Sequence, residues 1–195
     1  MPSIKRKVLV LIALLVVAFI AGIIFSPFLR ETTYQLKNWV GKPSPLPPVS
    51  KTVILYFSTP EGELLSPVER KIPVKKEIND EIRMVIGELI KGPKTRSLFP
   101  TVSPETKIRA VYTKGDTIYV DFSPSIVKNH PGGTSGELIT IYSIVNTLLE
   151  NFPSYSKVQI LVGGETINTL AGHIDIRGPF KKNPEMIEQS KILNR

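Results

Sequence analysis

The chain has 195 residues, no cysteine and a formal net charge of +8 at pH 7. The lack of cysteine excludes disulfides, thiolate catalysis, cysteine-ligated zinc and a lipid-modified N-terminal cysteine. Six of the 25 basic residues precede residue 51, so the rest of the chain, with 19 basic and 16 acidic residues, is too evenly mixed to predict a nucleic-acid-binding protein.

The N-terminal segment contains one long apolar run. Val8–Phe25 holds eighteen residues without a charge, and Phe28-Leu29 extends the run. Since about 20 apolar residues cross the hydrocarbon of a bilayer as a helix, we predict a transmembrane anchor over residues 8–29. The basic residues Lys5-Arg6-Lys7 place residues 1–7 in the cytoplasm by the positive-inside rule. The protein is then a single-pass protein of the cell membrane with an extracytoplasmic domain.

A cleaved signal peptide is the alternative to an anchor. Its apolar region usually has about 7–15 residues and ends at a small-x-small cleavage site. The run in this chain is longer, and Phe19-Ile20-Ala21 lacks the second small residue. The pattern therefore favours an uncleaved helix.

Residues 30–50 are predicted to form a proline-rich tether. Thr32–Val40 forms either a short amphipathic turn at the lipid headgroups or a disordered segment, and the sequence leaves both open. Four prolines then favour an extended, polyproline-like spacer, at positions 43, 45, 47 and 48.

The first half of the region 51–180 alternates strand and helix signals. Thr52–Ser58 is rich in β-branched and aromatic residues and predicts a buried strand. Leu64–Val74 contains two prolines, so it is expected to be at most an edge strand or an extended loop. Ile78–Lys91 repeats apolar residues at helical spacing and predicts a helix that stops at Gly92-Pro93.

The second half begins with a hairpin. The arms of Ile108–Phe122 flank Lys114-Gly115-Asp116, a turn signal, and the second arm alternates an apolar face with a polar face. A helix is predicted from Thr134 to about Asn151, with Thr134 and Glu137 as a capping box. Lys157–Val162 is the last predicted strand.

These elements predict an α+β two-layer sandwich. The expected order is βαββαβ, with two helices on one face of a small sheet and one transmembrane helix before the domain. Residues 181–195 are expected to form a C-terminal tail or a short, weakly held helix.

Seven short motifs in this order resemble the GerM domain, a family associated with spore formation and germination. The resemblance covers about Val53 to Phe180 and rests on Leu55-Tyr56-Phe57, Leu65-Ser66-Pro67-Val68-Glu69-Arg70, Leu89-Ile90-Lys91-Gly92-Pro93, Val120-Asp121-Phe122-Ser123, Gly136-Glu137, Val158-Gln159-Ile160-Leu161-Val162, and Leu170-Ala171-Gly172-His173-Ile174-Asp175 with Pro179-Phe180. The resemblance implies a small α+β unit similar to the ring-building modules of envelope-spanning assemblies. It brings no catalytic residues, and it does not imply that the host forms spores.

The candidate interaction residues come from these motifs and from the exposed aromatics. Tyr119 lies on the polar face of its predicted strand, where it could contact a partner or a sugar or support its cross-strand neighbours. The other candidates are Asp121, Leu170, Gly172, His173 and Asp175.

No catalytic, cofactor-binding or metal-binding residue is predicted. His173-x-Asp175 could join Asp121 and Glu137 at a metal, but the spacing does not force these residues together. No Gly-x-Ser-x-Gly elbow is present. A hydrolase would require His173 within hydrogen-bond reach of a nucleophile or a metal.

The sequence therefore predicts a non-enzymatic scaffold or interaction domain in a cell-envelope assembly. Its expected partners are copies of itself or other envelope proteins, with the membrane bound through the N-terminal helix and no nucleic acid. The alternative is a module that binds a cell-wall glycan or peptide. A concave, aromatic-lined groove would favour the alternative, and a self-complementary edge would favour the scaffold.

Overall fold

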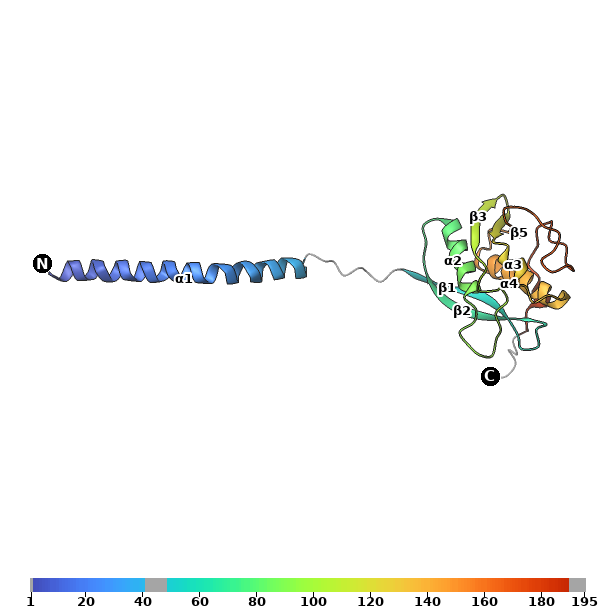
Figure 1. Ribbon diagram of the computed structural model, residues 1–195, viewed down its shortest axis with the longest axis horizontal. Coiled ribbons are helices and arrows are strands. Elements are labelled where there is room, and N and C mark those ends of the chain that lie inside the picture. The colour runs from blue at the N-terminus through green and yellow to red at the C-terminus, as the bar shows by residue number, and fades with distance from the viewer. Residues whose placement is uncertain (1, 41–48, 190–195) are drawn as a thin grey trace. The chain divides into compact units, whose positions relative to one another are not determined.

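The computed structural model describes residues 2–40 and 49–189, and within residues 2–40 it describes the side chains of residues 6–25. The chain divides into two compact units, residues 1–47 and 48–195. The first unit contains helix α1 (Pro2–Val40), and the second contains all other elements (Figure 1).

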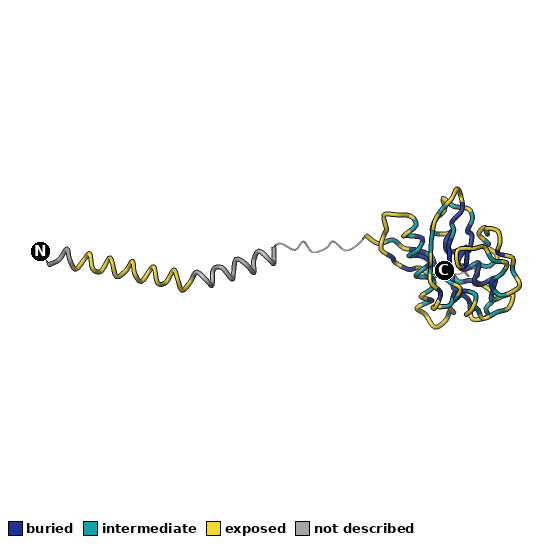
Figure 2. Tube along the Cα trace, turned by 45° about the horizontal axis from the view of Figure 1, so that its top comes forward, coloured by how far each residue is buried: buried dark blue, intermediate teal, exposed yellow. Residues whose placement is uncertain are grey.

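Helix α1 contains the predicted apolar run. Residues Arg6–Phe25 have a mean hydropathy of 3.4, and Figure 2 shows this part of the helix exposed throughout. Twenty residues of this composition are long and apolar enough to cross a membrane. The helix continues through residues 30–40, the first part of the predicted tether, whereas the proline-rich residues 41–48 lie outside the described residues.

Strands β1 (Ser50–Ser58) and β2 (Leu65–Pro73) form a two-stranded antiparallel sheet. They pair along their whole lengths, from Ser50 opposite Pro73 to Ser58 opposite Leu65. The hydrogen bond from Val74 N–H to Val49 O shows which residues of β2 direct their backbone groups toward β1. Because these residues alternate along the strand, the backbone groups of Pro67 and Pro73 face away from β1. A proline at an outward position removes no hydrogen bond from the ladder, which explains why this segment forms a complete edge strand.

The second edge of β1 is closed by side chains of helix α4 (Thr134–Asn151). The Asn151 side chain accepts a hydrogen bond from Ile54 N–H (2.9 Å) and donates one to Ile54 O (2.7 Å). Thr147 Oγ1 accepts a bond from Tyr56 N–H (3.1 Å). An amide side chain thus bonds β1 as a neighbouring strand would, and the edge is covered by a helix.

Strands β3 (Ile108–Lys114), β4 (Thr117–Phe122) and β5 (Lys157–Val162) form a three-stranded sheet with β4 in the centre. The predicted hairpin is confirmed, because β3 and β4 pair antiparallel around Gly115-Asp116 with a bulge at Arg109. β5 pairs parallel to β4.

Both long helices contact both sheets. Helix α2 (Ile78–Ile90) packs on β1, β3 and α4, and α4 packs on β1 and β5. One continuous apolar core results, and Figure 2 shows it as the buried interior of the second unit. Its largest fully buried side chains include Phe57, Phe122 and Leu89.

The α+β class is confirmed, but the predicted order and single sheet are not. The observed order after α1 is β1, β2, α2, β3, β4, α3 (Ser125–Lys128), α4, β5 and the 3-10 helix η1 (Pro184–Met186). The strands divide between two sheets, because α4 side chains and Phe99 occupy the edge of β1 that a third strand would need. Residues 190–195 of the predicted tail lie outside the described residues.

Candidate functional site

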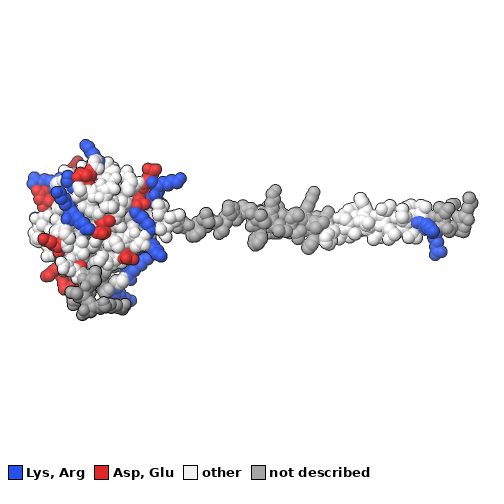
Figure 3. All heavy atoms as spheres, turned by 180° about the vertical axis from the view of Figure 1, so that it is seen from behind, with Lys and Arg blue, Asp and Glu red and all other residues white. Residues whose placement is uncertain are grey.

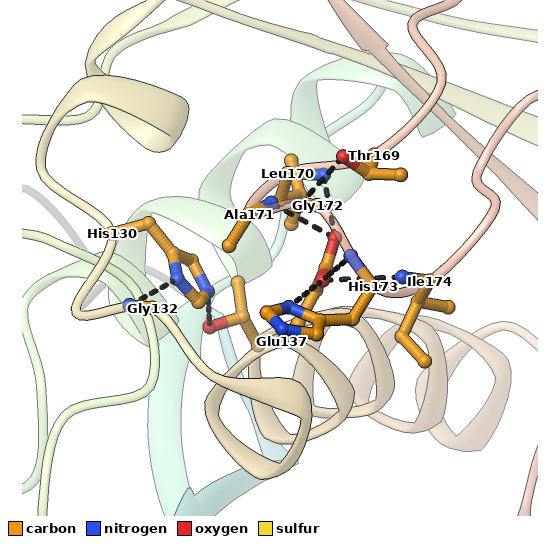
Figure 4. A network of polar contacts seen from close by, with 10 residues as sticks. His130, Gly132, Glu137, Thr169, Leu170, Ala171, Gly172, His173 and Ile174 are labelled. Carbon is orange, nitrogen blue, oxygen red and sulfur yellow. Dashed lines mark hydrogen bonds and ion pairs between the residues drawn. The ribbon is translucent and has the colours of Figure 1, made fainter.

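A buried carboxylate on α4 organises the C-terminal part of the domain. Glu137 has no exposed surface, and its two oxygens accept four backbone N–H bonds (Figure 4). Oε1 accepts from Leu170 (2.7 Å) and Ala171 (2.9 Å). Oε2 accepts from His173 (2.9 Å) and Ile174 (3.2 Å). This arrangement, here called the Glu137 cradle, holds residues 170–174 around one side chain.

The cradle keeps Glu137 ionised. Burial raises the pKa of this carboxyl, but the four backbone N–H donors outweigh that effect and hold its pKa below the usual range. A carboxylate has about four lone-pair sites, and the backbone fills them. The geometry therefore makes Glu137 a structural anion that fixes a loop, and it leaves no lone pair free to accept a substrate proton.

His130 forms a second polar network beside the cradle. Its Nδ1 accepts a hydrogen bond from Gly132 N–H (2.9 Å), so Nε2 carries the proton and donates it to Thr140 Oγ1 (3.1 Å). The Thr140 hydroxyl donates in turn to Thr101 O (2.8 Å). Burial lowers the pKa of His130 and outweighs the opposing charge of Glu137. The neutral imidazole therefore ties the start of α4 to two loops.

Four of the predicted interaction residues lie in the loop that forms the cradle, residues 163–180. Leu170 and His173 supply two of its N–H donors. Gly172 has a φ of 98°, which favours glycine, and its N–H donates to Thr169 Oγ1 (2.7 Å). Asp175 is exposed and pairs with Arg177, which holds the pKa of this carboxyl at about 2.

The other two predicted residues lie on β4. Asp121 is buried, accepts a hydrogen bond from Gly164 N–H (2.8 Å) and lies 3.5 Å from Nε of Arg109. Tyr119 stacks on Tyr112 of β3, with ring centroids 4.8 Å apart and planes inclined by 6°. Asp121 thus joins the start of the 163–180 loop, whereas Tyr119 belongs to a separate aromatic pair.

The polar face of β4 is more buried than its alternation predicts. The 163–180 loop contacts this face of the sheet, where Gly164 bonds to Asp121 and the Gln159 side chain donates to Ile176 O (3.0 Å). A loop across one face of a strand cannot be inferred from the period of that strand alone.

The predicted role of Glu137 is wrong. No side chain caps the first turn of α4; the N-cap is Gly133, with a φ of 79°. The carboxylate turns instead to a loop that follows it by more than thirty residues in the chain. Its signal in the sequence was its place in the Gly136-Glu137 motif, which gave no indication of its partner.

Within the part of the chain that the structure describes, no three His, Asp or Glu side chains form a group that could hold a metal ion. A small hollow of about 260 Å³ lies at the C-terminal end of α2. Its walls are mostly apolar: Ile90, Lys91, Gly92, Pro93, Thr95, Leu98, Pro100 and Pro104.

Two small sheets pack against two long helices, and a loop surrounds a buried glutamate of one helix. These features define a small α+β domain. Residues 54–168 match the model of the Germane family, described as sporulation and spore germination. The chain belongs to this family, and the resemblance to GerM domains inferred from the sequence motifs is confirmed.

Three solved structures share the fold. A 2.5 Å crystal structure of a presumed lipoprotein from Clostridium perfringens is 26% identical, with a TM-score of 0.51, over 69% of this chain and 89% of that one. The tandem GerMN domains of the sporulation protein GerM from Bacillus subtilis are 20% identical, with a TM-score of 0.55, over 75% of this chain and 51% of that one.

The first GerMN domain of the same Bacillus subtilis protein is 18% identical, with a TM-score of 0.53, over 67% of this chain and 97% of that one. No curated protein matches the chain.

Proposed function

We propose that this protein is a membrane-anchored, extracytoplasmic interaction module without enzymatic activity, which works by contacting other proteins of a cell-envelope assembly. The observation that carries this proposal is one chain that joins a membrane-length apolar helix to a GerM-type domain. The presumed lipoprotein relative supports an envelope location, because lipoproteins are also held at a membrane.

The proposed orientation places the N-terminus in the cytoplasm. Arg6 and Lys7 lie at the start of the apolar segment, and basic residues are retained on the cytoplasmic side of spanning helices. The domain then lies on the other side, where the absence of cysteine makes its stability independent of redox conditions.

Three carboxylates of the motifs that resemble the GerM domain support a non-enzymatic role. Glu137 accepts four backbone hydrogen bonds, Asp121 contacts Gly164 and Arg109, and Asp175 pairs with Arg177. Each is held in a structural contact. On the face shown in Figure 3, acidic and basic side chains of the domain are interspersed, which suits protein contacts better than a nucleic-acid backbone.

Cysteine crosslinking in intact membranes tests the proposal, because every introduced thiol is unique. Single cysteines at Lys71 on β2, Thr113 on β3 and Lys128 on α3 sample three surfaces. A ladder of homo-oligomers or a discrete heteromeric band at one position supports an interaction module. Equal, diffuse crosslinking at all three positions, or none at any of them, contradicts it.

A cell-wall glycan module is the second candidate, and the Tyr112–Tyr119 pair favours it. Tyr112 is 41% exposed, and exposed aromatic rings stack on sugar faces. Sedimentation with purified peptidoglycan tests this function. Loss of sedimentation in Tyr112→Ala, with retention in Tyr155→Ala, would support glycan binding; no sedimentation of the unaltered protein would contradict it.

A further inference from the structure

The outer edge of β3 offers unpaired backbone groups. Phe122 O accepts a hydrogen bond from Gly163 N–H on the β5 side, so alternate residues of β4, including Thr117 and Tyr119, face β3. Their partners on β3 are Lys114 and Tyr112. Backbone groups of a strand point to alternate sides from one residue to the next. Val111 and Thr113, which alternate with Tyr112 and Lys114, therefore direct their N–H and C=O groups away from the sheet. No described residue bonds to these four groups.

The other strand edges are occupied or interrupted. The α4 side chains close β1, and Phe180 exchanges two 2.8 Å hydrogen bonds with Val158 at the edge of β5. On β2, Pro67 and Pro73 lack N–H groups at two of the five outward positions, and Leu65 O accepts a bond from Glu188 N–H (2.8 Å). Among the described strands, β3 is thus the edge that is free of proline and of a bridging segment.

Part of the β3 edge is already covered. Arg83 of α2 donates to Ile108 O (2.9 Å) and to Arg109 O (3.3 Å), beside the bulge. The available segment is therefore Ala110–Lys114, which is long enough for a short added strand.

The charge on this edge selects the partner. Residues 107–114 carry Lys107, Arg109 and Lys114 and no acidic residue. Arg109 lies beside Asp121, but no described side chain contacts the charged ends of the two lysines. Like charges on facing strands are unfavourable, so pairing between the β3 strands of two copies is opposed, whereas an acidic strand is attracted.

We propose that the outer edge of β3 binds an extended, acidic segment of a partner protein, which adds a fourth strand to the sheet. Main-chain bonds to Val111 and Thr113 supply the binding, and the basic side chains select acidic residues in the added strand. The exposed ring of Tyr112 provides an apolar surface beside it. This inference rests on the proposed function as an interaction module.

Amide hydrogen exchange of the full-length protein in lipid nanodiscs tests the proposal. The probe is a capped seven-residue peptide that alternates Glu and Val, and the control peptide alternates Lys and Val. The outward amides of Val111 and Thr113 are expected to exchange at least about tenfold more slowly with the acidic peptide. The basic peptide should leave them unchanged.

Two test variants and one control variant locate the effect. Thr113→Pro removes one outward N–H and should abolish the protection of Val111, whereas Lys71→Pro, at an outward position of β2, should not. The double variant Lys107→Glu/Lys114→Glu leaves the backbone intact and should lose binding even if Thr113→Pro misfolds.

Three results would overturn the proposal: equal protection by both peptides, protection that survives in Thr113→Pro and in Lys107→Glu/Lys114→Glu, or protection that appears without peptide as the protein concentration rises. The third result would make a second copy the occupant. Crosslinking at a site other than β3 would retain the interaction function while this assignment of its surface fails.

Discussion

The Glu137 carboxylate, the Asp121 carboxylate and the Arg70 guanidinium are all buried, and each contacts main-chain atoms. Arg70 of β2 donates to the carbonyl oxygens of Glu88 (2.7 Å) and Gly92 (2.9 Å), at the C-terminal end of α2. A positive charge there offsets the helix dipole. These residues fix the ends of helices and loops, so changes to them are expected to affect folding before any contact with a partner.

Glu137→Gln is expected to destabilise the domain by about 2–4 kcal/mol. The amide nitrogen of Gln would face two backbone N–H groups that now donate to an oxygen, and those donors would be left buried without an acceptor. Urea unfolding of the detergent-solubilised protein measures the loss. Glu63→Gln, at an exposed position, is the control; equal stability of both variants would show that the cradle contributes little.

The half-buried His130 predicts a pH dependence of stability. Its folded pKa lies below the unfolded value of about 6.5, so the unfolded chain takes up a proton first as the pH falls. Stability is therefore complete above about pH 6.5, decreases as the pH falls below it, and levels off below the folded pKa. Unfolding at about pH 7.5 and about pH 5.5 measures this loss.

A variant of the histidine itself tests this assignment. His130→Gln should reduce the difference in stability between the two pH values. The Glu137 carboxyl, whose folded pKa is lowered, loses its contribution only as the pH falls further, through that folded pKa. An unchanged pH difference in His130→Gln would contradict the assignment.

At the scale of elements, several segments were predicted well from local pattern. Helix α4 and strand β5 have the predicted bounds, and α2 ends within one residue of them. Such elements are predictable because the periodicity and the stop signals that define them lie within a few neighbouring residues of the chain. β2 was predicted to be at most an edge strand or an extended loop, and it is an edge strand. The sequence left the choice open because it does not show whether a proline of a strand faces the partner strand or faces away from it.

The division into two sheets and the Glu137 cradle could not be predicted. Both depend on contacts between residues far apart in the chain: Asn151 meets Ile54, and Glu137 meets Leu170–Ile174. No local pattern records which loop will reach a buried acid. The candidates from the family motifs did include the loop residues, but they gave no account of what the loop surrounds.

Asn151→Ala is expected to expose the edge of β1 that side chains of α4 cover. The variant loses both bonds to Ile54, and we expect a loss of about 1–3 kcal/mol with faster amide exchange at Ile54. Asn151→Asp retains the acceptor for Ile54 N–H and should protect that amide better than Ala does. Equal exchange in the unaltered protein and in Asn151→Ala would show that packing alone covers this edge.

At the scale of the whole molecule, the chain joins a membrane-length helix to a domain that folds around its own core. The domain unit begins at Pro48 and its first strand at Ser50. Anchoring and partner contact are therefore expected to be separable properties of this protein.

We predict that the N-terminal helix is retained in the mature protein. Intact-mass measurement of the membrane fraction should find residues 6–25 still attached. The double variant Ile12→Lys/Val16→Lys should lower membrane retention, because each charge costs about 2.5–3.5 kcal/mol at the centre of a spanning helix. A membrane or secreted form that begins beyond Phe25 would instead identify a cleaved signal.

The C-terminal segment contacts two earlier elements of the domain, helix α4 and strand β2. Residues 170–174 surround Glu137, both main-chain groups of Asn183 bond to the Asn146 side chain, and Glu188 N–H bonds to Leu65 O. A chain that ends before residue 169 lacks all of these contacts, and we expect it to be protease-sensitive; resistance equal to the full chain would contradict this.

These contacts have a consequence for the order of biogenesis. The first sheet and helix α4 receive hydrogen bonds from residues 170–188, which the ribosome adds after both elements. Until residues 170–188 have been added, the domain lacks these bonds, and it is expected to stay loosely folded up to that point.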